Sequence, residues 1–319
     1  MPIELQTLAT RDNFNEVAYL AANQDVAAAV KAGTIESGKI HFEAFGRNEK
    51  RYLRGDPGTI EPLREIKLRR IADFLRSDLP STTTLYGKPD FLSPELREIS
   101  GITSTEAVSS NSYGMRGIDL INKHRDGLVL DCGAGRRDVY FENVVNFEIV
   151  DYDTTDVLGV GEELPFKDGT FDAVISIAVL EHVKDPFRCA REIIRVLKPG
   201  GDLYCAVPFL QPLHGYPHHY YNMSHQGLRS LFDHSMTITE QDVPKAGQPI
   251  WTLTWFLQRW DAQLPEEVRA SFRGKTIGEL LEPADRYLDE EWVKLLPKAA
   301  QFELASITTV LATKTDPLR

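Results

Sequence analysis

The sequence GLVLDCGAG, residues 127 to 135, decides the fold of this chain. It begins with an apolar run over residues 128 to 130 that ends in Asp131, and an apolar run bounded by turn residues predicts a buried strand. Gly133 and Gly135 follow, and glycine lets the backbone turn sharply and lets a ligand approach the main chain closely. The stretch therefore predicts a strand that leads into a binding turn.

Two side chains beside this turn bear on its role. A helix that begins near Arg136 would point its free N–H groups into the same crevice. Asp131 would either accept from an ammonium group or hold the glycine loop in shape. Because a strand followed by Gly-x-Gly also occurs in ordinary tight turns, the residues further along the chain decide its meaning.

Composition and charge argue against several classes of function. The 319 residues are 42% hydrophobic and 26% charged, which suits a globular protein with one large core and an accessory domain. The net charge is -11 without a Lys/Arg block, whereas nucleic acids and anionic membranes require a concentrated basic face. No apolar run approaches a membrane span and no signal-peptide pattern begins the chain, so we expect a cytoplasmic protein. Three cysteines without CxxC spacing predict reduced thiols rather than a disulfide framework or a zinc site.

Two segments precede the glycine turn. Residues 1 to 54 are predicted to form a small helical module, because apolar residues recur there at helical spacing. Residues 55 to 114 contain a loop-rich stretch over 81 to 113, which either covers a pocket as a lid or packs as a connector. They also contain one helix whose predicted apolar face consists of Leu63, Ile66, Leu68, Ile71, Phe74 and Leu75.

Strands and acids come after the glycine turn in a regular order. Residues 144 to 150 predict a second buried strand that carries Glu148. A carboxylate at the end of the second strand of a βαβ unit can accept both hydroxyls of a ribose, with Asp151 or Asp153 as alternatives. Residues 164 to 166 (Leu-Pro-Phe) can pack against the flat face of an adenine ring, while backbone N–H groups donate hydrogen bonds to its edge.

The remaining elements complete an alternating pattern. Residues 171 to 179 are apolar on both faces, as in a central parallel strand. An amphipathic helix over residues 185 to 201 ends in Lys-Pro-Gly-Gly, and residues 202 to 209 form the next strand. This order predicts an α/β protein with a doubly wound sheet.

The segments VLDCGAG, LPFKDGTFDAV, VLEHV and REIIRVLKPGG resemble class I S-adenosylmethionine-dependent methyltransferases, in particular the small-molecule group called methyltransferase type 11. The resemblance covers residues 115 to 235. It implies a Rossmann-like methyltransferase domain over residues 115 to 319 with a seven-stranded, mostly parallel sheet. Its last two strands, 236 to 243 and 306 to 314, would be antiparallel at the sheet edge, with a helical insertion over 247 to 305 between them.

The resemblance also implies a binding site for S-adenosylmethionine. The glycine turn would surround the methionine portion, and the acid that ends the second strand would bind the ribose. Later segments would lie along the adenine and line the pocket. These residues are Asp131, Gly133, Ala134 and Gly135 at the turn, Glu148 with Asp151 as its alternative, Glu162 and Leu164 along the adenine, and Ile177 and Ala178 at the end of the fourth strand.

Several positions depart from related patterns. The family often has an Asp for the adenine amino group where this chain has Val160, so backbone groups and Glu162 would hold the base. Arg136 and Arg137 follow the glycines where small residues are usual, which would alter how the predicted short helix meets the ligand. A nicotinamide-binding domain is disfavoured, because it requires a third glycine where this chain has Asp138.

The segment PFLQPLHGYPHHYYNMSHQ gathers four histidines just after the fifth strand: His214, His218, His219 and His225. A metal site would use His-x3-His with His219, but the spacing is broken by Pro and Gly and lacks a carboxylate partner. The histidines either order the loop or form an acceptor site in which one of them is the general base. We predict His214 and His218 as catalytic residues, because the loop leaves the sheet at the edge that faces the ligand.

The acceptor and the partners are predicted from weaker signals. The segment NEVAYLAANQDVAAAVKAGTIESGKIHFEAFGRNEKR resembles a module of bacterial polysaccharide-synthesis proteins, often glycosyltransferases. It implies O-methylation of a sugar in a surface polysaccharide or glycolipid precursor. A small-metabolite methyltransferase and a non-catalytic scaffold for glycosyltransferases are the alternatives. The tryptophans of the insertion would cap an acceptor pocket, form a homodimer surface, or pack internally: Trp251, Trp255 and Trp260.

Overall fold

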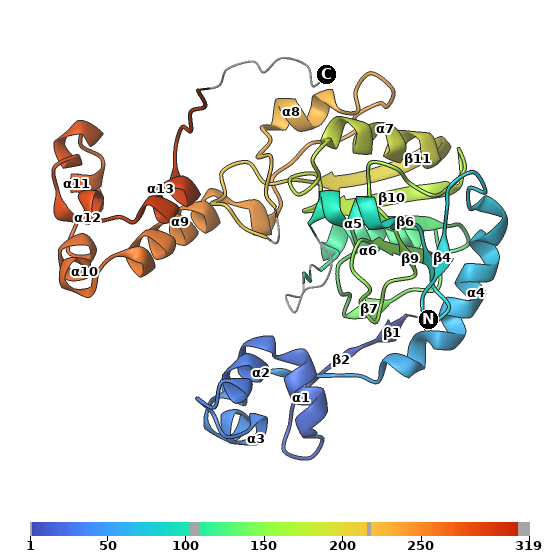
Figure 1. Cartoon of the computed structure of the whole chain (residues 1–319), viewed down its shortest axis with the longest axis horizontal. Helices are drawn as coiled ribbons and strands as arrows, with labels where there is room; N and C mark the ends of the chain where they lie inside the picture. Colours follow the sequence, from blue (N-terminus) through green and yellow to red (C-terminus); the bar gives the residue numbers. More distant parts are fainter. Residues whose placement is uncertain (1, 102–108, 111, 216–217, 312–319) are drawn as a thin grey trace, which may run out of the picture. The chain divides into compact units, whose positions relative to one another are not determined.

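The computed structural model describes residues 2 to 101, 109, 110, 112 to 215 and 218 to 311. The chain forms two compact units (Figure 1), and each has its own hydrophobic core. The first unit comprises Met1–Val207 with Gly215–Ile238, and the second comprises Pro208–His214 with Thr239–Arg319. No helix in the described part of the chain combines the length and the apolar character that a membrane crossing requires.

A seven-stranded sheet forms the centre of the first unit, with the strand order β11-β10-β6-β8-β9-β5-β4. Every neighbouring pair is parallel except β4 with β5. The chain leaves β6 toward β8 on one side and later returns to β10 on its other side, so the direction of winding reverses between β6 and β10. The strands are β4 (Thr82–Thr83), β5 (Pro89–Asp90), β6 (Val129–Cys132), β8 (Val144–Glu148), β9 (Val157–Leu158), β10 (Phe171–Ile177) and β11 (Leu197–Ala206).

The sheet confirms the predicted fold class, but its two edge strands come from an unexpected part of the chain. The prediction of strands over 236 to 243 and 306 to 314 is wrong: residues 236 to 243 and 306 to 311 form no strand, and 312 to 314 lie outside the described residues. Met236 and Ile238 instead pack on the core without pairing, a use of two alternating apolar residues that the sequence cannot distinguish from a short strand. Residues 82 to 90 supply β4 and β5.

Both faces of the sheet are buried, as the continuous apolar strands predict. Alternate residues of β6, β8 and β10 face two separate clusters. Leu130, Val145 and Val174 pack toward helix α7 (Pro186–Val196), and Val129, Val144 and Ala173 pack toward helix α6 (Gly114–Lys123). This double cover fixes the carboxyl ends of the central strands in place.

The predicted helix at Arg136 does not form. Residues 133 to 138 have no helical turn, and the short strand β7 (Val139–Tyr140) follows them. The connection from β6 to β8 has fewer residues than a helical crossover usually takes. Strand β1 (Ile3–Glu4) pairs antiparallel with β7, so the N-terminal segment covers the place of the missing helix.

The N-terminal region is helical, as predicted. Its core contains Tyr19, Val26 and Phe42, and the antiparallel pair β2 (Gln6–Leu8) and β3 (Tyr52–Arg54) closes it. Its helices are α1 (Glu16–Ala22), α2 (Gln24–Lys31), α3 (Gly38–His41) and the π-helical turn η1 (Phe42–Gly46).

Helix α4 (Glu61–Ile71) buries two cations in addition to most of the predicted apolar face. Leu63, Leu68 and Ile71 pack on the hydrophobic cores, as does Leu75 just beyond the helix. Arg64 and Lys67 are fully buried, whereas Ile66 and Phe74 are exposed. The cause is Asp156, also fully buried, which lies 2.7 Å from Lys67 Nζ. Burial lowers the pKa of Lys67 to about 8, against the opposing effect of the Asp156 carboxylate.

The second unit is helical across the predicted insertion. Trp260 packs on Phe272 and Trp292 inside its core, whereas Trp251 is exposed. Its elements are η4 (Lys245–Gly247), α9 (Pro249–Gln263), α10 (Glu266–Arg273), α11 (Ile277–Leu280), η5 (Ala284–Tyr287), α12 (Glu291–Lys294) and α13 (Lys298–Leu304). The remaining helical elements, in the first unit, are η2 (Pro57–Ile60), η3 (Ala72–Phe74), α5 (Pro94–Ser100) and α8 (His225–Ser230).

Candidate functional site

The glycine turn lies where the carboxyl ends of β6, β8 and β10 meet, at the reversal of the sheet winding. Gly133 and Gly135 have left-handed φ angles of +79° and +63°. A Cβ on Gly133 would lie 2.4 Å from Val179 Cγ2, and one on Gly135 would lie 2.7 Å from the Ser109 carbonyl oxygen. Both positions therefore require glycine, as the sequence predicts for a sharp turn.

Glu148 lies against this turn. Its carboxylate accepts from the backbone N–H of Gly135 at 2.7 Å and of Ile149 at 2.8 Å. Burial raises the pKa of Glu148, although these N–H groups act in the opposite direction. The two stretches that the sequence analysis linked, residues 131 to 135 and Glu148, are thus in direct contact.

The two alternative ribose acids are each paired with cations. Asp151 accepts from Lys88 Nζ at 2.6 Å. Asp153 accepts from Arg54 and Arg136, each at 2.9 Å, and these cations lower the pKa of Asp153 despite its burial. Glu148 accepts from backbone N–H groups instead, and this difference favours it over both alternatives as a ligand for neutral hydroxyls.

Asp131 is fully buried and paired within the chain. It accepts from Arg137 Nε at 2.7 Å and from the Tyr113 hydroxyl at 2.8 Å, and the guanidinium carbon lies 4.1 Å from the Tyr113 ring centre. Burial opposes the charge of Arg137, but the Asp131 carboxylate outweighs it and raises the pKa of Arg137. Asp131 therefore holds the segment after the glycine turn, and an ammonium group would have to share it with Arg137.

The two predicted adenine residues are both hydrogen-bonded. Leu164 is fully buried in the core, and its N–H donates to Glu192 Oε2 at 2.9 Å. Glu162 Oε1 accepts from the N–H of Lys184 at 3.1 Å, beside the start of α7. Glu162 thus links the predicted adenine segment to the turn that precedes α7.

The carboxyl end of β10 contains a strained residue. Ala178 has a φ of +55°, a left-handed conformation that alanine rarely adopts, and its N–H donates to the Ala206 carbonyl at 2.9 Å. Ile177, the last residue of β10, is half-buried. Strain of this kind gathers at functional edges, where the surrounding structure enforces it.

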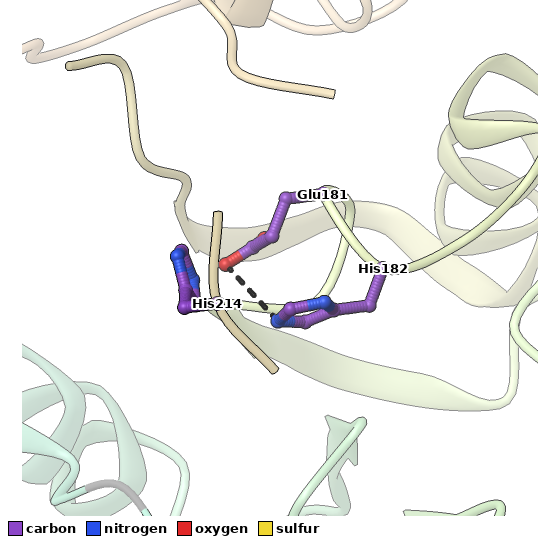
Figure 2. Close-up of side chains that lie close together, drawn as sticks. All are labelled: Glu181, His182 and His214. Atoms are coloured by element: carbon purple, nitrogen blue, oxygen red, sulfur yellow. Dashed lines mark ion pairs between the residues drawn. The ribbon is translucent and has the colours of Figure 1, made fainter. Parts of the chain in front are cut away.

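The turn after Ala178 brings together an acid and a histidine to which the sequence analysis assigned no role. Figure 2 shows the ion pair of Glu181 and His182, with Oε1 and Nε2 3.8 Å apart. Glu181 is fully buried, and His182 is partly exposed. The available signal was an acid that interrupts the apolar run directly after the central strand, followed by an imidazole.

The histidine-rich loop contacts this turn through its backbone. The His218 carbonyl lies 2.8 Å from His182 Nδ1, and the Tyr220 N–H donates to the Glu181 carbonyl at 2.7 Å. The ring of His219 stands edge-on to that of His182, with centres 5.5 Å apart.

The two histidines predicted to be catalytic fall in different units. His218 lies in the first unit, with its ring centre 5.2 Å from that of Tyr220. His214 lies in the second, where its Nδ1 is 2.9 Å from the Pro212 carbonyl and its ring packs against Trp255. His225, the last of the four, begins α8.

A doubly wound sheet with a glycine turn and an acid at its point of reversal defines a Rossmann-like nucleotide-binding domain. Residues 132 to 205 match the family described as a methyltransferase domain, which confirms the methyltransferase class predicted for this part of the chain. The match includes Gly133, Gly135, Glu148 and His182.

Similar proteins cover parts of the same region. Norajmaline N-methyltransferase of Rauvolfia serpentina is 46% identical over 56 residues, 18% of each chain. A Mycolicibacterium smegmatis protein named "Probable S-adenosylmethionine-dependent methyltransferase" is 27% identical over 143 residues, 38% of this chain and 56% of its own. The Bacillus subtilis protein YcgJ has 16% identity, a TM-score of 0.30, and coverage of 48% of this chain and 88% of its own. The chain thus spans less than a fifth of the plant relative and about half of the mycobacterial one.

Proposed function

We propose that this protein is a cytoplasmic methyltransferase that uses S-adenosylmethionine to methylate a sugar hydroxyl in a surface polysaccharide or glycolipid precursor. The observation that carries the methyltransferase assignment is the contact between the glycine turn and Glu148, at the sheet's point of reversal and within the matched segment. A nucleoside that lies across this point meets a backbone without side chains and a carboxylate held by backbone N–H groups.

The residues present fit the cofactor. Gly133 and Gly135 have no room for a Cβ, and Ala134 between them is buried, so no bulky side chain of this turn would keep the methionine portion from its backbone. Glu148 would accept from the two ribose hydroxyls. Asp131 would accept from the ammonium group on a carboxylate that it shares with Arg137, and the Arg137 contact keeps the turn in shape.

The rest of the pocket would be formed by the later predicted residues. Glu162 would lie along the adenine beside Leu164, which keeps that segment anchored in the core. Ile177 and Ala178 would line the pocket at the end of β10, where the strained backbone of Ala178 redirects the chain. Asp151 stays an alternative ribose ligand if Lys88 releases it.

The cofactor supplies a methyl group on a sulfonium, which is already activated for displacement. The task of the protein is to hold the acceptor oxygen in line with the methyl carbon and to keep water away. We place the acceptor beside the histidine-rich loop, with His214 and His218 as the predicted catalytic residues.

Two features support a sugar as the acceptor. The N-terminal module resembles one of polysaccharide-synthesis proteins, and a glycosyltransferase that supplies the substrate is the partner that this resemblance suggests. Tyr220 and Tyr221 are exposed beside the Glu181–His182 turn, and an aromatic face with a hydroxyl edge suits the apolar and polar faces of a sugar ring.

Two other functions have an observation in their favour. The plant relative is named for N-methylation of a small molecule, so a small-metabolite acceptor is the second candidate. The pairing of Asp131 with Arg137 favours a non-catalytic scaffold, because the ammonium group of the cofactor would have to share that carboxylate with a guanidinium.

Calorimetric titration with S-adenosylmethionine tests the cofactor assignment. We expect Glu148→Gln to weaken binding by about tenfold or more, because hydrogen bonds to a charged acceptor contribute about 1.5 to 3 kcal/mol. Glu142→Gln is the matched control, since Glu142 is an exposed acid just before the other end of β8. No heat from the wild-type protein at millimolar ligand, or equal affinity of both variants, would defeat the assignment.

Transfer of a labelled methyl group separates the acceptor classes. The protein is incubated with labelled S-adenosylmethionine and, in parallel, with surface glycans, lipid-linked sugars and a pool of small metabolites. We expect label in a glycan fraction that acid hydrolysis releases as an O-methyl sugar. Label confined to small metabolites would favour the second candidate, and cofactor binding without any transfer would favour the scaffold.

A further inference from the structure

We propose that His182 is the general base of the methyl transfer, accepting the acceptor hydroxyl's proton at Nε2, and that Glu181 positions and stabilises it. This inference rests on the proposed methyltransferase function with a hydroxyl acceptor. It adds a catalytic residue in the turn after β10, outside the two histidines predicted from the sequence.

His182 belongs to the same edge as the glycine turn. The His182 N–H donates to the Val179 carbonyl at 2.8 Å, which closes a tight turn after Ala178. Val179 in turn packs so closely on Gly133 that a Cβ there would meet it at 2.4 Å. Val179 therefore links the turn that contains His182 to the Gly133 backbone, against which the methionine portion would lie.

The surroundings of His182 fix which ring nitrogen carries the proton. Nδ1 lies 2.8 Å from the His218 carbonyl, and a carbonyl can only accept, so Nδ1 is the donor. In the neutral ring, Nε2 is then left with its lone pair, the state that a general base requires. A carbonyl that holds the second nitrogen in this way also fixes the orientation of the ring.

The ring itself is held by backbone rather than by flexible side chains. A Cβ on Gly215 would lie 2.3 Å from His182 Cε1, so the left-handed glycine at φ +83° lets the loop pass directly over the imidazole. His219 packs edge-on from the same loop. The His182 side chain nevertheless keeps 30% of its surface exposed, which leaves a path for an acceptor and for the released proton.

Glu181 supplies the charge that the protonated base needs. Its carboxylate is fully buried, and Oε1 lies 3.8 Å from Nε2, too far for a hydrogen bond but close enough for strong attraction in a poorly solvated place. Of the titratable groups that the structure describes around the ring within the first unit, Glu181 faces Nε2 and His219 faces the ring edge. An imidazolium formed here is stabilised by the acid on its own turn.

The step balances in protons and electrons. The acceptor O–H bond breaks and its proton moves to Nε2 while the oxygen forms a bond to the methyl carbon. The methyl carbon–sulfur bond breaks, its electron pair neutralises the sulfonium, and S-adenosylhomocysteine leaves. The imidazolium then releases its proton to solvent through the exposed part of the ring.

The test combines cofactor binding, transfer rate and pH dependence in three variants. We expect His182→Gln to bind S-adenosylmethionine like the wild type but to lose on the order of 100- to 10,000-fold in kcat, together with the acidic limb of the pH–rate profile. Glu181→Gln should lower kcat by roughly tenfold while KM and cofactor affinity stay unchanged, because the imidazolium formed in the step loses its counter-charge. His234→Gln, an exposed histidine of the same unit, should change neither kcat nor the acidic limb.

Two results would overturn the proposal. One is a loss in His182→Gln of less than about threefold, or a loss that leaves the acidic limb unchanged. The other is a nitrogen NMR spectrum of the wild type in which the neutral His182 carries its proton on Nε2, which needs no acceptor to observe. If the wild type binds cofactor but transfers no methyl group, the proposed function fails and this inference fails with it, whereas failure of cofactor binding in His182→Gln alone would show a structural role.

Discussion

The carboxyl edge of the central sheet has two halves that are built differently. At the ends of β6 and β8, side chains are locked by buried ion pairs: Asp131 with Arg137, and Asp153 with Arg54 and Arg136. After β10, the histidine-rich loop contacts the Glu181–His182 turn through its own backbone groups, and His182 remains partly exposed. The first half is suited to hold a fixed ligand, and the second is suited to admit an acceptor and move a proton.

The difference has an origin in the chain. The acidic loop after β8 is held by cations from the residues that precede β6, among them Arg54, Arg64, Lys67 and Lys88. The region before the methyltransferase segment therefore replaces the missing helix after the glycine turn and supplies positive charge to the same loop. The half after β10 receives no such support from the described N-terminal helices.

The largest effect is expected from Asp156→Asn in the locked half. Asp156 is fully buried and lies 2.7 Å from Lys67 Nζ and 3.5 Å from Arg64 Nε. Its loss leaves the buried Lys67 without its carboxylate and leaves Arg64 with Glu61 alone, which costs about 3 to 5 kcal/mol of unfolding free energy. Denaturant unfolding measures this loss, and Asp168→Asn, at a highly exposed carboxylate paired with Arg195, should cost less than about 1 kcal/mol.

Equal stability of Asp156→Asn and Asp168→Asn would contradict the comparison. It would mean that the buried pairs do not lock the β6–β8 half, and that packing alone fixes it.

Much of the locked half could be predicted from the sequence. The strands around Val129, Val144 and Phe171 are predicted by continuous apolar runs, and Gly133 and Gly135 by the turn that such a strand requires. These signals are local, and the contact of Glu148 with Gly135 arises because neighbouring parallel strands end at the same edge.

The rest depends on contacts between distant residues. The buried cations of α4 face Asp156, 89 positions after Lys67, so helical periodicity finds most of the apolar face but not these buried charges. Strands β4 and β5 have two residues each, which is too short for a pattern. The orientation of His182 depends on the carbonyl of His218, 36 positions later, and a carbonyl contact has no sequence signature.

A smaller effect is expected from Gly133→Ala, with Gly87→Ala as its control. Both glycines have left-handed φ angles, +79° and +76°, so both substitutions carry similar backbone strain. Only at Gly133 would the new Cβ meet a neighbour, Val179, while nothing lies within 4 Å at Gly87. We expect Gly133→Ala to cost about 1 to 3 kcal/mol more than Gly87→Ala and to be the only one that weakens cofactor binding.

Thermal unfolding and calorimetric titration of both variants check this expectation. Equal stability and equal cofactor affinity would show that the Gly133 backbone does not pack closely on the Val179 side chain, and the cofactor would then have to bind elsewhere.

The smallest substitution, Tyr→Phe, removes one hydroxyl and keeps the ring. Made once in each half, it compares their contributions to stability. The Tyr140 hydroxyl donates to the buried Asp156 carboxylate, and burial together with that carboxylate raises the pKa of Tyr140. The Tyr221 hydroxyl donates to the Lys184 carbonyl at 3.2 Å in an exposed place. We expect Tyr140→Phe to cost about 1.5 to 3 kcal/mol of stability and Tyr221→Phe about 0.5 kcal/mol or less.

The activity readout should reverse this order. Tyr140 is buried in a cluster with Leu5 and Ile60, so Tyr140→Phe should leave KM for the proposed sugar acceptor unchanged in the folded fraction. Tyr221→Phe should raise KM, because its hydroxyl lies beside the proposed acceptor site. Measuring both the unfolding free energy and KM in the two variants therefore distinguishes the two halves. The half at the ends of β6 and β8 should affect stability, and the half after β10 should affect acceptor binding. If both variants lose stability equally, or if KM changes only in Tyr140→Phe, the two halves of this edge do not have the different roles proposed here. The fold of the sheet would not be affected by that result.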